Sequence, residues 1–169
     1  LSFSDITAMK HMEAQLRRAQ ELGQLQLHWQ PRVDAVSGDL LGVEGLLRWH
    51  HPELGTVSPT VFIPLAEDSG LIVPMGAWVI EQACAQIVAW RAAGQPAFFV
   101  SINLSARQLR DEHLIDTVRQ SLHRHGVPHG MLELELTESM VMDKASHNMR
   151  QLHALRELGG HRPRIDTPY

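Results

Sequence analysis

The sequence predicts an α/β fold in which a parallel sheet is covered by helices. After an initial pair of strands, strand-type and helix-type segments alternate along the chain, an order that requires parallel strands joined by helical crossovers. The segment 98–104 is almost continuously apolar, as is typical of a strand within such a sheet. Three strand segments also separate into an apolar face for the helix layer and a face that carries polar residues.

The N-terminal third predicts a helix followed by a β-hairpin. Apolar residues recur three or four apart over 4–22, with Ser4 or Asp5 as the cap, and Gly23 ends this amphipathic helix. Residues 25–31 then alternate with a period of two, which indicates a half-buried strand. A turn-type segment leads into a second strand that pairs back, so the first two strands are expected to be adjacent and antiparallel; the turn and strand are residues 34–39 and 40–49.

The remainder of the chain predicts alternating helices and strands. A short helix capped by Ser58 or Thr60 precedes a longer helix, which has Pro74 in its first turn and ends at Gly94. The later elements are a strand at 98–104, a helix at 111–125, a strand at 131–137 and a helix at 143–158.

Composition excludes several classes of protein and partner. The 169 residues carry 15 Lys and Arg against 19 Asp and Glu, and 44% are hydrophobic, so the chain is expected to fold and to lack a basic footprint for a DNA or RNA duplex. The single cysteine, Cys84, forms no internal disulfide, and the eleven histidines lack the paired spacing of a structural zinc site. Neither a leader nor a run of about 18 apolar residues is present, which predicts a cytoplasmic chain without a membrane segment.

Polar residues on the strands predict a site at one end of the sheet. Glu44 and Arg48 share a face of the second strand, and Asn103 and Glu135 lie on the equivalent faces of the third and fourth. The carboxyl ends of parallel strands meet at the same edge, where α/β folds place their sites. Oxygen ligands favour Mg²⁺ or Mn²⁺, and an arginine suits a phosphate oxygen, so the pattern points to phosphate-ester chemistry.

The same residues also fit a purely structural interpretation, and the pattern leaves both open. In that alternative Glu44 and Arg48 form a surface ion pair, Asn103 caps the following helix, and Glu135 is merely solvated.

Five motifs in series resemble those of the EAL domain family, over roughly residues 16–159. They are Trp29-Gln30-Pro31, Val43-Glu44-Gly45-Leu46-Leu47-Arg48-Trp49, Phe62-Ile63-Pro64-Leu65-Ala66-Glu67, Ser101-Ile102-Asn103-Leu104-Ser105 and Glu135-Leu136-Thr137-Glu138. The resemblance implies a (β/α)8 barrel of the TIM type with an inverted first strand. It also implies hydrolysis of cyclic di-GMP to linear pGpG in bacterial signalling, with two divalent ions, Mg²⁺ or Mn²⁺, and in-line attack by a metal-activated water.

The resemblance assigns roles to six residues. Glu44, Asn103 and Glu135 resemble metal ligands, with the two glutamates taking part in catalysis, and Glu138 resembles a glutamate that steadies a loop beside the site. The substrate contacts that it implies are Gln30 to guanine and Arg48 to phosphate.

Gly45 departs from the family's Glu-Ala-Leu motif by one methyl group. It is expected to face away from the site and to cost the strand no more than about 1 kcal/mol.

The resemblance stops where the family continues into a strand ending in paired aspartates. Residues 160–169 are polar and contain Pro163 and Pro168, so they are not expected to form a buried strand, and Asp166 is interpreted as a coincidental match. We therefore predict three parts: residues 1–22 as a linker helix, 23–159 as the N-terminal part of an EAL domain, and 160–169 as a tail. Residues 3–16 resemble the end of a PAS sensor domain, and the alternative is a helix that packs on the barrel's end.

About four of the eight strands of such a barrel are accounted for, since a full barrel takes about 250 residues. Unpaired sheet edges are expected to favour association with a second copy, and an interrupted reading frame after Gly159 would explain the tail. We expect a phosphodiesterase domain that is inactive as this chain, and the alternative is a non-catalytic module that binds cyclic di-GMP or a protein.

Overall fold

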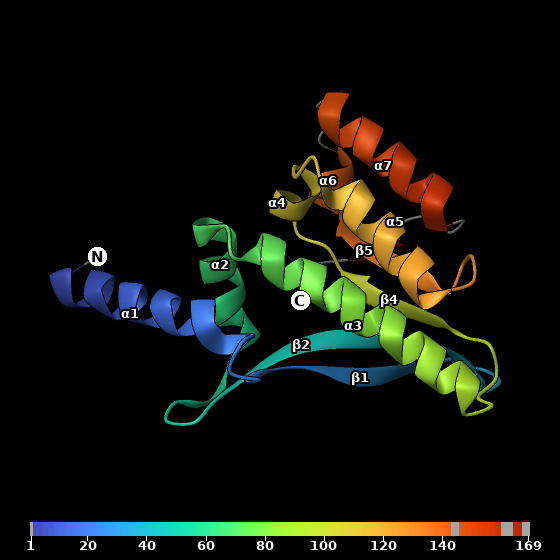
Figure 1. Ribbon diagram of the computed structural model, residues 1–169, viewed down its shortest axis with the longest axis horizontal. Helices are drawn as coiled ribbons and strands as arrows, with labels where there is room; N and C mark the ends of the chain where they lie inside the picture. The colour runs from blue at the N-terminus through green and yellow to red at the C-terminus, as the bar shows by residue number, and fades with distance from the viewer. Residues whose placement is uncertain (1, 143–145, 160–163, 167–169) are drawn as a thin grey trace.

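The computed structural model describes residues 2–142, 146–159 and 164–166 (Figure 1). Its elements, in chain order, are α1 (Phe3–Ala19), β1 (Leu25–Val33), β2 (Leu40–His51), β3 (Gly55–Val57), α2 (Pro59–Ser69), α3 (Ile72–Ala92), β4 (Phe99–Asn103), α4 (Ala106–Leu109), α5 (Leu114–His125), β5 (Leu132–Thr137), α6 (Glu138–Met142), α7 (Ser146–Gly159) and β6 (Arg164–Asp166).

One sheet organises the described residues. The strand order is β1-β2-β4-β5-β6, and β3 adds to β2. The pair β1 and β2 is antiparallel, whereas β2, β4, β5 and β6 run parallel. Figure 1 shows α3, α5 and α7 side by side against this sheet, with α1 extending to one side. This partial α/β sheet with an antiparallel first strand confirms the predicted fold class.

The C-terminal tail contains a short strand that was not predicted. Residues 164–166 form β6, which pairs in parallel with β5 and sets Asp166 beside Thr137. This strand was missed because the prediction required an apolar alternation, which three residues are too few to show. The side chain of Asp166 lies outside the described residues, so its interpretation as a coincidence stays a prediction.

Three further short elements, β3, α4 and α6, were not predicted because three to five residues are too few to show a hydrophobic period. Gly55, with a positive φ of 69°, makes the turn that returns β3 onto β2. At α4 a capping box forms, in which Ser105 Oγ accepts from the Gln108 amide while the Gln108 side chain accepts from the Ser105 amide.

The core lies between the sheet and α3. Val100 and Ile102 of β4, with Leu104 just beyond its end, are buried in one cluster with this helix, and their burial confirms the predicted apolar face. Among the described residues α3 is the one helix long and apolar enough to cross a membrane, but here its apolar residues Ile80 and Ile87 are buried in the core.

The helix α1 joins a second cluster of buried residues around Trp49 and Phe62. Leu16 of α1 is fully buried there. Next to it, His51 Nε2 lies 2.8 Å from Gln15 Oε1, which ties α1 to the end of β2. The N-terminal helix is therefore packed on the domain, while the predicted domain boundaries themselves stay predictions.

Gly45 lies in a space that leaves no room for a methyl group. A Cβ there would come 2.8 Å from the Trp29 ring and 3.3 Å from Ile102, and the Trp29 ring is itself held edge-on to Trp90, with ring centroids 5.2 Å apart. The cost of glycine in this strand is thus offset by close packing. We expect Gly45→Ala to lower the free energy of unfolding by about 1–2 kcal/mol in urea denaturation. The double variant with Trp29→Phe should recover part of this loss, and an equally stable or more stable single variant would contradict the steric explanation.

A polar cluster joins α3 to α5. The Glu81 carboxylate accepts from Ser121 Oγ at 2.8 Å, lies 2.7 Å from His125 Nε2 and pairs with Arg124 at 2.8 Å. Burial opposes ionisation, but these hydrogen bonds outweigh it and lower the pKa of Glu81 to about 2.

Glu81 should make stability depend on pH in acid. Because its folded-state pKa lies below the ordinary value of 4.5, its contribution is complete above that value and is lost as the pH falls toward 2. We expect Glu81→Gln to lower the free energy of unfolding by about 1 kcal/mol at pH 7. The variant should also flatten the dependence of stability on pH between 4.5 and 2. Asp116→Asn, in an exposed pair on α5, the helix that supplies the partners of Glu81, is the control for thermal melts across this range. An unchanged slope for the Glu81 variant would contradict the assignment.

Candidate functional site

The polar face of the sheet holds two carboxylates that share one arginine. Arg32 of β1 reaches across the sheet, and its Nη2 lies 2.6 Å from Glu44 Oε1 and 2.5 Å from Glu135 Oε1. The Glu135 side chain is only 3% exposed, and those of Glu44 and Arg32 are 17% and 20% exposed. Three charged groups from β2, β5 and β1 thus meet in a place that is largely shielded from water.

The strand register explains how these side chains meet. Glu44 pairs with Ser101 across β2 and β4, and Asn103 pairs with Glu135 across β4 and β5, so all four side chains share one face of the sheet. Arg32 lies opposite Gly42, farther along the antiparallel partner. Sequence reasoning missed Arg32, although the two-residue period of β1 places it on the same face as Gln30.

Burial and the neighbouring Glu44 carboxyl raise the pKa of Glu135, because two like charges at close range cannot both ionise freely, while Arg32 and the Ser101 hydroxyl lower it. Together these effects bring the pKa of Glu135 to about 7. A buried acid beside a second acid is a common feature of sites that bind a cation or transfer a proton.

The purely structural interpretation is wrong at three points. Glu44 pairs with Arg32, whereas Arg48 donates to the Leu47 carbonyl oxygen at 2.9 Å. The cap of α4 is Ser105, one residue beyond Leu104, so Asn103 does not cap the helix. Glu135 is buried and not solvated.

A cavity of about 490 Å³ opens at the carboxyl ends of β2, β4 and β5. Arg48, Asn103 and Thr137 border it from the strands, and Glu67 borders it from α2. Burial, together with the nearby Asp68, raises the pKa of Glu67, and Arg110 opposes this shift. The cavity therefore combines apolar walls with a cation, an amide and a carboxyl group, which is the chemistry of a pocket for a polar ligand.

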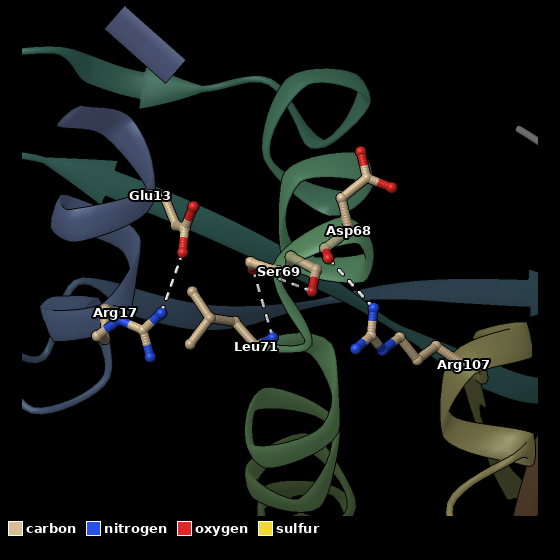
Figure 2. A network of polar contacts seen from close by, with 7 residues as sticks. Glu13, Arg17, Asp68, Ser69, Leu71 and Arg107 are labelled. Atoms are coloured by element: carbon tan, nitrogen blue, oxygen red, sulfur yellow. Dashed lines mark hydrogen bonds and ion pairs between the residues drawn. The ribbon is translucent and has the colours of Figure 1, made fainter. Parts of the chain in front are cut away.

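The cavity wall at α2 is held in place by contacts between helices (Figure 2). Arg107 of α4 donates to the carbonyl oxygens of Glu67 at 2.8 Å and Asp68 at 3.2 Å, where α2 ends. Gly70 then turns the chain with a φ of 82°, and a Cβ at this position would come 3.1 Å from the Arg107 guanidinium. Arg107 thus caps α2 and fixes the bend before α3.

Two further predicted site residues make no described contact with this cluster. Gln30 is exposed on β1 and pairs in register with Glu44. Glu138 begins α6, directly after β5, but its side chain lies outside the described residues. The structure therefore brings Glu44 and Glu135 together, places Asn103 and Arg48 at the cavity, and leaves Gln30 at the margin.

The donors fit a small divalent cation in their chemistry. Carboxylate oxygens from two strands already surround one positive group, the Arg32 guanidinium, and oxygen donors are what Mg²⁺ and Mn²⁺ prefer. Within the described parts of the chain, no three His, Cys, Asp or Glu side chains gather as a metal-binding group. The two glutamates, with the amide of Asn103 next in register, are thus the ligands that this region offers.

Comparison with known proteins identifies a family and its relatives. The EAL domain family matches residues 13–160. The bifunctional diguanylate cyclase/cyclic di-GMP phosphodiesterase MucR of Pseudomonas aeruginosa is 44% identical over 144 residues, which are 85% of this chain and 21% of that protein. The oxygen sensor protein DosP of Escherichia coli is 40% identical over 146 residues, 86% of this chain and 18% of that protein.

Solved structures agree with this result. The PaMucR phosphodiesterase in its c-di-GMP complex has a TM-score of 0.83 at 43% identity, covering 90% of this chain and 60% of that one. The EAL enzyme Bd1971, in its cAMP and cyclic-di-GMP bound form, has a TM-score of 0.84 at 28% identity, covering 98% of this chain and 46% of that one. The chain thus spans about a fifth of these curated relatives and about half of these solved chains.

Proposed function

Because the chain belongs to the EAL domain family, we propose that it forms part of a cyclic di-GMP phosphodiesterase domain of bacterial second-messenger signalling. The observation that carries this proposal is the buried carboxylate pair of Glu44 and Glu135 on the strand face that leads into the cavity bordered by Arg48. Relatives named as cyclic di-GMP phosphodiesterases, and a related structure solved with c-di-GMP, support the choice of ligand.

In this proposal each side chain has a separate task. Glu44, Glu135 and Asn103 would hold a divalent ion, Mg²⁺ or Mn²⁺, whose Lewis acidity would assist hydrolysis of a phosphodiester bond to give linear pGpG. Arg48 presents a guanidinium to a phosphate oxygen from the cavity wall, and Gln30 offers an amide to a guanine edge. Burial around Glu135 excludes water from the protein side of the pair.

We further propose that these 169 residues bind cyclic di-GMP but do not hydrolyse it on their own. Two carboxylates and one amide hold a divalent ion weakly, since such ions take six or more oxygen ligands. Incubation with Mn²⁺ and chromatography of the nucleotides should show no pGpG, while calorimetry should show binding. Metal-dependent pGpG that disappears in Glu44→Gln would contradict the inactivity and support the phosphodiesterase. Neither binding nor turnover would contradict the proposal as a whole.

A non-catalytic module that binds cyclic di-GMP or a protein is the second candidate. It is favoured by the ion pairs of Arg32, which already neutralise part of the carboxylate charge. Tight binding of cyclic di-GMP that is indifferent to Mg²⁺ and EDTA would favour this candidate over the phosphodiesterase. The cytoplasmic location and the association with a second copy stay predictions, which cell fractionation and sedimentation would test.

A further inference from the structure

The guanidinium of Arg32 lies where a cation between the two carboxylates would bind. It crosses from β1 over β2 and β4 to reach Glu135 on β5, and the same Nη2 contacts Glu44. When both carboxylates are ionised, the two acids and the one guanidinium carry a net charge of -1, and all three groups are largely withdrawn from water. An ionised carboxylate that is buried lowers the stability of the fold unless a positive group stays close to it.

We propose that Arg32 is the internal counter-ion of this site, so that a divalent cation must displace it in order to bind between Glu44 and Glu135. This inference rests on the proposed function, because it concerns the ion that the phosphodiesterase would need. One positive group already contacts an oxygen of each carboxylate, and a second cation in the same place would meet its repulsion as well as the attraction of the acids.

The position of Arg32 would allow its side chain to leave the carboxylates and enter water. It lies near the end of β1, the edge strand, between Pro31 and Val33, which are both exposed. Its own side chain is 20% exposed, against 3% for Glu135. A rotation about its long, flexible stem would bring the guanidinium into water, whereas the buried glutamates would stay in place. Because the ion pairs of Arg32 must break before a cation binds, the free energy of those ion pairs lowers the affinity for the metal.

Titration of Mn²⁺, followed by electron paramagnetic resonance of the free ion, tests this competition directly. Arg32→Met keeps the length and apolar stem of the side chain and removes its charge, so it should bind Mn²⁺ about tenfold more tightly than the unchanged chain. Arg32→Lys should lie in between. Arg119→Met removes an arginine from an exposed pair on α5 and should leave the affinity unchanged. In EDTA, Arg32→Met should melt at a lower temperature than the unchanged chain, and Mn²⁺ should reverse the loss.

Equal or weaker Mn²⁺ binding by Arg32→Met would overturn the counter-ion role. The proposed function would then stand if cyclic di-GMP still bound, and it would fall with the inference if no variant bound either ligand. Should Arg32→Met not fold, the Arg32 Nε–H resonance of the unchanged chain gives the same information. Added Mg²⁺ should speed its exchange with water as the guanidinium leaves the carboxylates, and an unchanged resonance at saturating Mg²⁺ would overturn the proposal.

Discussion

Replacing Arg48 by glutamine is expected to weaken the binding of cyclic di-GMP by about 10- to 100-fold. Among the described residues that border the cavity, Arg48 is the one with a positively charged side chain, and a hydrogen bond to a charged group contributes about 1.5–3 kcal/mol. Its Nη1 donates to the adjacent Leu47 carbonyl oxygen at 2.9 Å, a local contact whose loss should change stability little. Isothermal calorimetry measures the affinity, and urea denaturation checks that the variant stays folded.

The dependence of cyclic di-GMP affinity on salt concentration should distinguish a direct contact by Arg48 from a general loss of positive charge. Binding to the unchanged chain should weaken as ionic strength rises, since a phosphate contact is partly screened, and Arg48→Gln should reduce this dependence. Arg119→Gln on α5 is the matched control, because its pair with Asp116 is exposed and neither residue is among those that border the cavity. Unchanged affinity in Arg48→Gln would remove this residue from the site and with it one support of the proposed function.

The sequence was most informative where a hydrophobic period extended over several turns or strand residues. The helix at α3 and the strands β2, β4 and β5 were predicted together with their faces, because burial on one side determines which residue types occur there. The short β6 was missed since three residues carry no period and because its pairing depends on β5, a partner that local sequence does not reveal.

The sequence predicted most of the residues of the site but not the ion pairs between them. The period of two put Glu44 and Arg48 on one face, and from this pattern a mutual ion pair was as reasonable as a shared site. The structure instead pairs Glu44 with Arg32, from another strand. Reach across a curved sheet depends on tertiary structure, and so do the burial of Glu135 and the shape of the cavity.

Glu135→Gln is expected to stabilise the protein at neutral pH in EDTA, although Glu135 is a candidate ligand. Burial and the nearby Glu44 raise its pKa to about 7 from an ordinary value of 4.5. Below the lower value the carboxyl is protonated in both folded and unfolded chains, so it costs nothing. As the pH rises from 4.5 toward 7, the unfolded chain releases a proton that the folded chain retains, and stability falls. Glutamine carries no such proton.

The expected gain for Glu135→Gln is about 2 kcal/mol at pH 7.5, with little difference from the unchanged chain at pH 4.5. Urea denaturation at both pH values measures it, and Glu157→Gln on the exposed side of α7 should show no comparable gain. The same variant should lose Mn²⁺ binding, because an amide replaces a carboxylate. A site residue whose removal stabilises the fold indicates that the two acids are kept together for a ligand and not for stability. Lower stability of Glu135→Gln at pH 7.5 would instead indicate that the ion pair between Glu135 and Arg32 stabilises the fold.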